Sequence, residues 1–361
     1  MRVLIAPDKF AGTLTAVEAA EAIATGWGRH APDDELDLCP MADGGPGFVD
    51  VLHASLGGEL LAVTVRGPHG APVPTTILVQ GRAAYVESAQ ACGRHLAADG
   101  DAERATTYGV GELLLEAAAT GVDEVVVGLG GSGTNDGGAG LLAALGATGD
   151  APLDAGPAGL AGLSRLDLGP VRDRLGGVRL VAASDVDIPL TGLFGATKTF
   201  GEQKGIAVDR MPAVDAVLEA FAGLAGARTA LEKGAGAAGG LGYALLLLGA
   251  DRTPGVDVVS AAVGLAGRAR SADLVVTGEG AFDFSSRSGK VPYGVAAVAG
   301  EQLRPCIALA GQVLVGSREM RALGVESGYS VVELLGEERA FGDPAGALAD
   351  LAERVARSWS R

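Results

Sequence analysis

Apolar and polar positions alternate in blocks at the start of the chain. Residues 3–6 form a short apolar run of strand-forming side chains. Thr15 and Glu18 then have the spacing of a helix capping box, and apolar residues follow at helical intervals. A second strand is predicted at 36–39 and a helix at about 47–56. This strand–loop–helix order predicts a parallel, wound α/β sheet.

Residues 60–90 have a different pattern. Short strands separated by turns are predicted at 61–65, 75–79 and 83–87, which is typical of hairpins and indicates entry into a second domain. Later buried strands are predicted at 125–127, 180–183, 274–276 and 307–310. The last two strands return to the strand–loop–helix order of the N-terminal segment.

Length and charge narrow the class of protein. The chain has 361 residues, enough for two domains at roughly 150 residues each. Its formal net charge is −16, which argues against a nucleic acid or an anionic membrane as the main partner, because both need a dense basic surface. Hydrophobic residues make up 48% of the chain, so the 58 glycines belong to a folded protein rather than to a disordered one.

Cysteine usage and apolar runs indicate a soluble, cytoplasmic protein. The three cysteines lie far apart and form no C-x-x-C pair, which disfavours a disulfide framework or a cysteine-rich zinc site. The N-terminal apolar run is too short for a signal peptide. The longest apolar run, near residues 241–250, is about half of a membrane span.

Two glycine-rich segments are candidate binding loops. Residues 128–133 read G-L-G-G-S-G directly after a predicted strand, which matches the dinucleotide-binding pattern G-x-G-x-x-G. The polar residues that follow, Thr134, Asn135 and Asp136, better suit a loop that binds phosphate or a small hydroxylated substrate. The second segment, 234–242, is either another anion-binding helix start or a hinge beside a closely packed helix.

Carboxylates follow the predicted strands. Asp8 and Asp43 come after the first two strands of the chain, and four further carboxylates come after later strands: Asp185, Asp187, Glu279 and Asp283. Ligands of wound α/β sheets bind outside the carboxyl ends of strands, so we expect these side chains to converge. Phosphoryl transfer needs carboxylates to hold Mg²⁺ and to accept the proton of the attacking hydroxyl.

Lysines are embedded in the same kind of loop. Lys9, Lys204 and Lys290 each lie in a loop that carries glycines or carboxylates, and they are candidate phosphate-neutralising groups in this acidic chain.

Several other mechanisms are disfavoured. The chain contains no G-x-x-x-x-G-K-[ST] phosphate loop and no G-x-S-x-G nucleophile motif, and its four histidines lack metal-ligand spacing.

Taken in order, these segments resemble the bacterial glycerate kinase family, the glycine-rich type without a Walker motif. The resemblance covers almost the whole chain and is specific because the segments occur in family order. The segments are 6–13 (APDKFAGT), 40–45 (PMADGG), 106–112 (TTYGVGE), 128–140 (GLGGSGTNDGGAG), 184–190 (SDVDIPL), 200–205 (FGEQKG), 234–242 (GAGAAGGLG), 277–280 (TGEG) with Asp283, and Gly289-Lys290.

The resemblance implies a fold of two α/β domains. One is Rossmann-like, with a parallel sheet, and contains both termini. The other is a mixed α/β domain inserted into it. We place the first at 1–70 plus 265–361 and the second at 71–264, and the resemblance implies an active site in the cleft between them. It leaves the oligomeric state open.

The resemblance further implies transfer of the ATP γ-phosphoryl group to a hydroxyl of D-glycerate, with Mg²⁺. We expect 2-phosphoglycerate as the product and keep 3-phosphoglycerate as the alternative. The catalytic candidates are Asp43, Asp185, Asp283 and Lys9, with the base and the metal ligands among the three aspartates left open. Asp185 and Asp187 are candidate metal ligands. The candidate ATP-binding residues are Gly130, Gly131, Ser132, Thr134, Asn135, Asp136, Lys204, Glu279 and Lys290.

Four positions depart from the family pattern. Ala11 stands where Lys is usual, Pro46 where Glu is common, Ile188 where Asn is usual, and Ala281 where Arg or Ser is frequent.

Two other functions stay open. A nicotinamide-dependent oxidoreductase would use residues 128–133 and an acidic residue about 20 positions later. A non-catalytic sensor of phosphorylated sugar acids would need an output module, which the sequence does not show.

Overall fold

The chain folds into two compact units. The computed structural model describes residues 1–97, 101–171, 173–283 and 290–360. Unit 1 comprises Met1–Asp43, Asp50–Gly57 and Gly255–Arg361, and unit 2 comprises Gly44–Val49 and Gly58–Pro254. Both chain ends therefore belong to unit 1. The predicted limits of 1–70 plus 265–361 and 71–264 stay a prediction of domain extent.

A parallel sheet forms the centre of unit 1. Its strands run in the order β15 (Ser327–Ser330), β13 (Cys306–Ala310), β11 (Leu274–Thr277), β1 (Arg2–Ile5) and β2 (Glu35–Leu38). In the register, Val3 lies opposite Leu274 and Ile5 opposite Val276. Every residue of β11 and β13 is buried, because helices cover both faces of the sheet. A short parallel pair, β12 (Ala281–Phe282) and β14 (Gln312–Val313), continues beyond β11 and β13.

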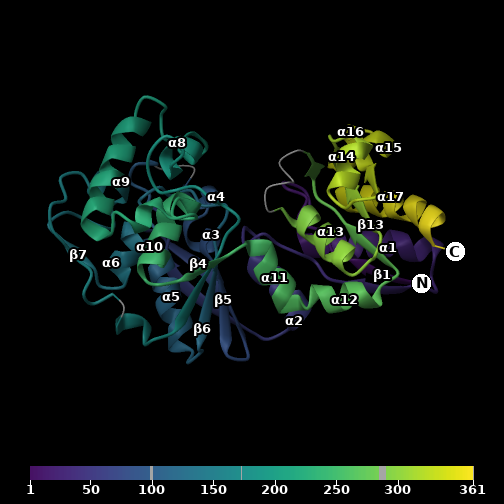
Figure 1. The fold of residues 1–361 in the computed structure, drawn as a ribbon, viewed down its shortest axis with the longest axis horizontal. Coiled ribbons are helices and arrows are strands. Elements are labelled where there is room, and N and C mark those ends of the chain that lie inside the picture. Colours follow the sequence, from purple (N-terminus) through teal and green to yellow (C-terminus); the bar gives the residue numbers. More distant parts are fainter. Residues whose placement is uncertain (98–100, 172, 284–289, 361) are drawn as a thin grey trace. The chain divides into compact units, whose positions relative to one another are not determined.

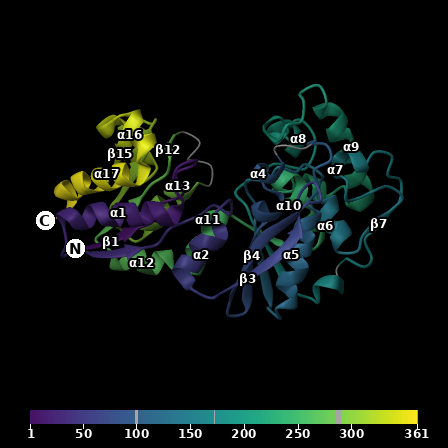
Figure 2. The same ribbon diagram turned by 180° about the vertical axis from the view of Figure 1, so that it is seen from behind.

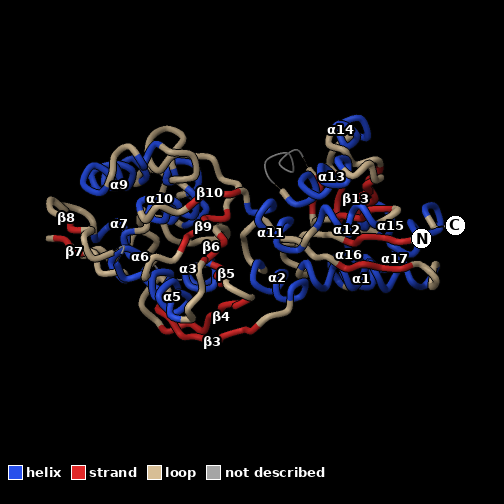
Figure 3. Tube along the Cα trace, turned by 60° about the horizontal axis from the view of Figure 1, so that its bottom comes forward, coloured by secondary structure: helices blue, strands red, loops and turns tan. Residues whose placement is uncertain are grey.

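Two long helices pack together beside this sheet. The first, α1 (Ala16–His30), begins at the predicted capping box, in which Thr15 and Glu18 bond reciprocally. It lies along α17 (Pro344–Trp359), and α12 and α13 lie on the opposite face (Figures 1, 2 and 3). The other helices of unit 1 are α2 (Phe48–Leu56, which starts in unit 2), α11 (Gly255–Val263), α12 (Leu265–Ser271), α13 (Val291–Glu301), α14 (Ser317–Ala322), α15 (Val331–Leu335) and α16 (Glu337–Gly342).

Unit 2 contains a mixed sheet. Its order is β10 (Asp251–Thr253), β9 (Arg179–Ala183), β6 (Glu124–Gly128), β5 (Ala83–Glu87), β4 (Pro72–Gln80) and β3 (Glu59–Arg66). The predicted hairpin segment forms the antiparallel edge β3–β4–β5, and the remaining neighbours pair in parallel. Figure 3 shows the order of these strands. The parallel strands β6 and β9 therefore end at the same edge, with the first glycine-rich loop and Asp185 directly beyond them.

Helices and short turns complete unit 2. They are α3 (Ser88–Cys92), α4 (Arg94–Ala97), α5 (Tyr108–Ala119), α6 (Ala139–Ala144), α7 (Gly156–Gly159), α8 (Ala196–Phe200), α9 (Met211–Ala225) and α10 (Leu241–Leu247), the 3-10 turns η1 (Asp173–Leu175), η2 (Glu202–Lys204), η3 (Thr229–Leu231) and η4 (Ala237–Gly240), and the short pair β7 (Thr148–Gly149) and β8 (Leu166–Asp167). The core of unit 2 is mainly Ala, Val and Leu. Among the described residues, no helix is both long and apolar enough to span a bilayer.

The predicted fold class is confirmed. The structure has a Rossmann-like unit with a parallel sheet that contains both termini, and a mixed α/β unit inserted between its first and last segments.

Candidate active site

The loop after β1 brings an ammonium group beside two carboxylates. The Lys9 Nζ lies 3.4 Å from an oxygen of Asp43 and 3.6 Å from one of Asp8. Asp8 is buried, and its side chain accepts a hydrogen bond of 2.7 Å from the Lys9 backbone N–H. Burial, with a smaller contribution from Asp43, raises the pKa of Asp8 to about 6 although Lys9 opposes it. Burial also lowers the pKa of Lys9, but the two carboxylates outweigh it and the pKa is raised.

The loop after β11 carries a second group of the same kind. The Lys290 Nζ lies 3.7 Å from an oxygen of Glu279 and 3.8 Å from one of Asp283. The two loops run side by side, because the Asp8 backbone N–H donates a hydrogen bond of 2.8 Å to the Gly278 carbonyl. The structure therefore brings together five of the predicted site residues in unit 1: Lys9, Asp43, Glu279, Asp283 and Lys290. Gly289, in the predicted Gly289-Lys290 motif, lies outside the described residues.

The first glycine-rich loop of unit 2 is fastened to the segment before α4. Gly93 and Ser132 form an isolated bridge, and the Gly133 N–H donates to the Cys92 carbonyl at 2.7 Å. Gly131 has a φ of +67°, a conformation that side-chain-bearing residues rarely adopt. Helix α6 begins only at Ala139. The helix N-terminus that would hold a pyrophosphate in a dinucleotide-binding fold is thus absent at residues 128–133, which argues against the oxidoreductase interpretation.

The buried side chains of Asn135 and Asp136 anchor this loop through hydrogen bonds. Both are fully buried. Asp136 accepts hydrogen bonds from the backbone and hydroxyl of Thr107 and from the N–H groups of Gly138 and Gly140. The Asn135 amide donates to the Thr197 hydroxyl at 2.8 Å. These contacts explain why a carboxylate and an amide follow the glycines: they fix the loop, and the structure uses both carboxylate oxygens of Asp136 for this purpose.

Lys204 lies beneath the loop. Its side chain is buried, and its Nζ donates to the Ser132 hydroxyl at 2.9 Å and to the Thr134 carbonyl at 2.6 Å. Burial lowers the pKa of Lys204 to about 8, because it outweighs the opposing effects of Cys92 and Asp136, and the charge of Arg94 acts in the same direction as burial. The second glycine-rich segment packs here. A side chain at Gly239 would collide with the Thr134 carbonyl oxygen and come within 2.7 Å of the Lys204 Nζ, so close packing explains that glycine.

Arg94, which no sequence motif marks, completes this region. It lines two cavities of unit 2, of about 680 and 300 Å³, together with Gly131 and Lys204. Among the described residues, no carboxylate lies within ion-pair distance of Arg94 or Lys204. Two cations beside a loop of backbone amides favour an anionic ligand. In the sequence, Arg94 and His95 directly follow Gly93, which could have marked an anion-binding loop. Basic residues are so common on protein surfaces, however, that this pattern alone does not predict a site.

The two predicted metal ligands differ in their surroundings. Asp185 is half-buried directly after β9. Asp187 is 57% exposed and forms ion pairs with Arg252 and with Lys233, the latter at 3.6 Å. Within the part of the chain that the structure describes, no group of three His, Cys, Asp or Glu side chains could hold a metal ion. Mg²⁺ commonly uses one or two carboxylates plus substrate phosphates, so single carboxylates such as Asp185 or Asp283 still fit it.

Known proteins resemble this chain in sequence and in fold. The model of the glycerate kinase family matches residues 3–360. The chain is 40% identical to the glycerate kinase of Bacillus subtilis, over 92% of this chain and 90% of that protein, and 36% identical to the glycerate 2-kinase of Escherichia coli, over 93% and 92%. The crystal structure of a Salmonella typhimurium LT2 protein designated glycerate kinase 2 covers 99% of this chain and 98% of its own, with a TM-score of 0.84 and 35% identity. The chain therefore belongs to the glycerate kinase family, and it is a phosphotransferase that acts on an alcohol group.

Proposed function

We propose that the protein transfers the γ-phosphoryl group of ATP to a hydroxyl of D-glycerate and that the product is 2-phosphoglycerate. Family membership supports glycerate as the acceptor, and the name of the Escherichia coli relative supports the 2-position. The structural observation that carries the proposal is the pair Lys204 and Arg94, two cations that share cavities with a loop of backbone amides. Phosphates and carboxylates are the ligands that such an arrangement stabilises.

Each unit has a separate task in this proposal. In unit 2, Lys204 and Arg94, with the amides of Gly130, Gly131 and Ser132, bind an anionic group of a substrate. Asn135, Asp136 and the backbone of Thr134 keep the loop in place. In unit 1, Lys9 and Lys290 neutralise phosphate oxygens, and Glu279 holds Lys290. Phosphoryl transfer consists mostly of such positioning and charge neutralisation.

Three carboxylates are candidates for the remaining roles. One of Asp43, Asp185 and Asp283 accepts the proton of the attacking glycerate hydroxyl, and the others are available as oxygen ligands. When bound, Mg²⁺ neutralises charge on the phosphate oxygens. Asp185 and Asp283 are the residues of this chain that we propose to hold it. Asp187, already paired with Arg252 and Lys233, would have to give up both ion pairs to do so.

The test is ³¹P NMR of the purified protein incubated with ATP, Mg²⁺ and D-glycerate. A new resonance of 2-phosphoglycerate, with ADP formed in equal amount, is the expected result. A resonance of 3-phosphoglycerate would retain the kinase and overturn the regiochemistry. Unchanged ATP would overturn the proposal, provided that the protein is folded by far-UV circular dichroism.

A further inference from the structure

A cavity in unit 1 lies where the direction of strand succession reverses. The sheet has the strand order β15-β13-β11-β1-β2. After β1 the next strand, β2, is added on one side, whereas after β11 the strands β13 and β15 are added on the other side. The reversal point therefore lies between β1 and β11. Sheets of this order bind ligands at that reversal point, outside the carboxyl ends of the strands. The loops after β1 and β11 supply Phe10, Ala11 and Gly280 to the wall of the cavity.

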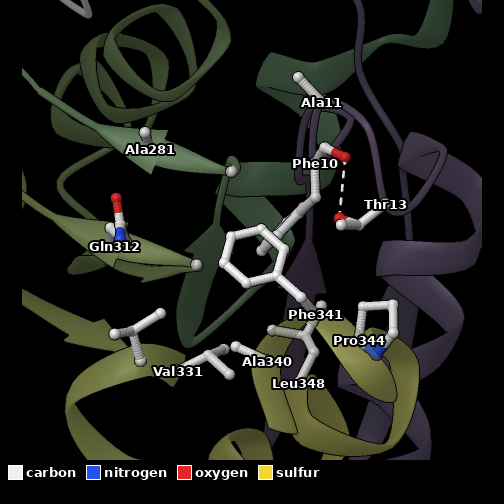
Figure 4. Close-up of a pocket in the computed structure, with 13 residues that line it drawn as sticks. Phe10, Ala11, Thr13, Ala281, Gln312, Val331, Ala340, Phe341, Pro344 and Leu348 are labelled. Atoms are coloured by element: carbon white, nitrogen blue, oxygen red, sulfur yellow. Dashed lines mark hydrogen bonds between the residues drawn. The ribbon is translucent and has the colours of Figure 1, made fainter. Parts of the chain in front are cut away.

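The lining of the cavity is mostly apolar. The loop after β1 supplies Phe10, Ala11 and Thr13, and the C-terminal helices supply the opposite wall (Figure 4). The residues of that opposite wall include Val331, Ala340, Phe341 and Leu348. The volume is about 210 Å³. Sites for whole drug-sized ligands typically measure about 300–1,000 Å³, so this one suits a single flat ring system with the rest of the ligand outside.

Two side chains of the lining are suited to an aromatic ring with polar edges. Phe341 is 64% exposed, an unusual state for so large an apolar side chain, and its ring is available for stacking. Gln312 offers an amide with both a donor and an acceptor, and the described residues provide no hydrogen-bond partner for it. A glutamine amide can form paired hydrogen bonds with adenine. D-Glycerate, a small polar anion, would gain little from these walls.

The cavity adjoins the charged groups of unit 1. Ala11 comes two residues after Lys9, and Gly280 directly follows Glu279, which pairs with Lys290. The two loops touch, because a side chain at Gly280 would come within 3.2 Å of the Ala11 backbone nitrogen. A ligand with its ring in the cavity could therefore extend an anionic tail along these loops toward ammonium groups.

We propose that this cavity holds the adenine ring of the phosphate donor. This inference rests on the proposed function for the identity of the ligand, and it places the ring among Phe341, Ala340 and Gln312 of the lining. The triphosphate extends past Ala11 and Gly280 toward Lys9 and Lys290.

Two substitutions on α16 test the cavity without touching the charged groups. Ala340→Leu narrows the cavity, and Phe341→Ala removes the stacking ring. Each should raise the KM for ATP about tenfold, which corresponds to about 1.4 kcal/mol and lies within the range for base–aromatic stacking. The KM for D-glycerate and kcat at saturating ATP should change less than about twofold, because the lost contacts are remote from the transferred group.

Base-free and phosphate-free probes separate the ring from the tail. Adenosine should compete with ATP in the wild-type enzyme, and both variants should weaken this inhibition about tenfold. Inorganic triphosphate should inhibit the wild type and the variants equally. Gln312→Leu should reduce the preference for ATP over GTP. Ser358→Leu is the matched control, because Ser358 lines another cavity of unit 1, of about 270 Å³, at its edge strand β15.

Failure of this inference can be told apart from failure of the proposed function. Saturation-transfer NMR with adenosine needs no turnover, so it tests the cavity even in a protein that leaves ATP unchanged. If the enzyme makes phosphoglycerate but neither α16 variant changes the KM for ATP, while thermal unfolding shows both to be folded, the cavity does not hold the base. Absence of adenosine binding to the wild type would give the same answer.

Discussion

The polar groups of the two units differ in charge balance. In unit 1, Lys9 and Lys290 each have two carboxylates within 4 Å, so four acidic groups surround two basic ones. In unit 2, the described residues give Lys204 only a hydroxyl and a carbonyl, and they give Arg94 no carboxylate. The first arrangement places carboxylates, which can accept a proton or bind a cation, beside the two lysines. The second has positive charge beside backbone amides, an arrangement that suits an anionic ligand.

This difference explains two opposite pKa shifts of lysines in one protein. Lys9 and Lys204 are both removed from water, which favours the neutral amine. Carboxylates outweigh this effect at Lys9 and its pKa is raised. At Lys204, burial outweighs the opposing effects of Cys92 and Asp136, and the pKa is lowered to about 8. A buried lysine that lacks an acidic partner is costly to the fold, so its presence points to a function rather than to stability.

The largest effect is expected in the carboxylates. Among Asp43→Asn, Asp185→Asn and Asp283→Asn, the variant that removes the general base should lower kcat about 10³-fold, with a much smaller change in KM, because proton transfer takes place in the transition state. Steady-state kinetics with both substrates varied measures this. Asp257→Asn, an exposed carboxylate in the first turn of α11, is the control. An unchanged kcat in all three variants would break the assignment of acid–base chemistry to these groups.

Removal of the unneutralised cation comes next. Lys204→Met should lower kcat/KM by between about 10² and 10³, the usual loss for a group that stabilises developing charge. The free energy of unfolding should not fall, because the variant removes a desolvated charge. Urea denaturation and kinetics together test this, with the exposed Lys198→Met on α8 as the control. A Lys204→Met protein that is destabilised yet fully active would show that Lys204 is a structural residue.

The loop anchor should act on stability. Asp136→Asn places an amide donor where the Thr107, Gly138 and Gly140 N–H groups need an acceptor, so we expect a loss of about 3 kcal/mol in unfolding free energy. Urea denaturation checks this. Asp209→Asn, which changes an exposed carboxylate of the same unit, should shift stability by less than about 0.5 kcal/mol. Equal stability of the two variants would contradict the anchoring role.

The smallest effect is a pH dependence. Lys204 is charged below its pKa of about 8 and neutral above it, so binding of an anion to it should weaken as pH rises through that value. We expect kcat/KM to fall about tenfold per pH unit above the pKa. The Lys204→Met variant should not show this decrease in kcat/KM at high pH. If kcat/KM of the wild-type enzyme stays constant up to pH 9.5, the ammonium group of Lys204 does not take part in substrate binding.

The same pKa shift affects stability. In the unfolded chain the lysine keeps its ordinary pKa of 10.5, so between about pH 8 and 10.5 the unfolded state binds a proton that the folded state lacks, and the contribution of Lys204 to the free energy of unfolding rises with pH.

Local patterns in the sequence were sufficient for much of the fold. The apolar run at 3–6, the capping box at Thr15 and the hairpin pattern at 60–90 predicted β1, α1 and the antiparallel edge of unit 2, since each depends on neighbouring residues. The motifs that resemble glycerate kinases marked the loops after β1, β6 and β11. The roles of individual residues there stay predictions.

What the sequence by itself determined, then, was the α/β class, the family and the loops in which chemistry can occur, because strand-end loops of a parallel sheet follow from the order of the elements. Only the tertiary structure decided which charges meet. Arg94 joins Lys204 across 110 residues of chain, Asp136 turns inward to Thr107, and Asp187 pairs outward with Arg252. The sequence spacing of charged residues carries no such information, since Coulomb and hydrogen-bond energies depend on distance and burial in the folded chain.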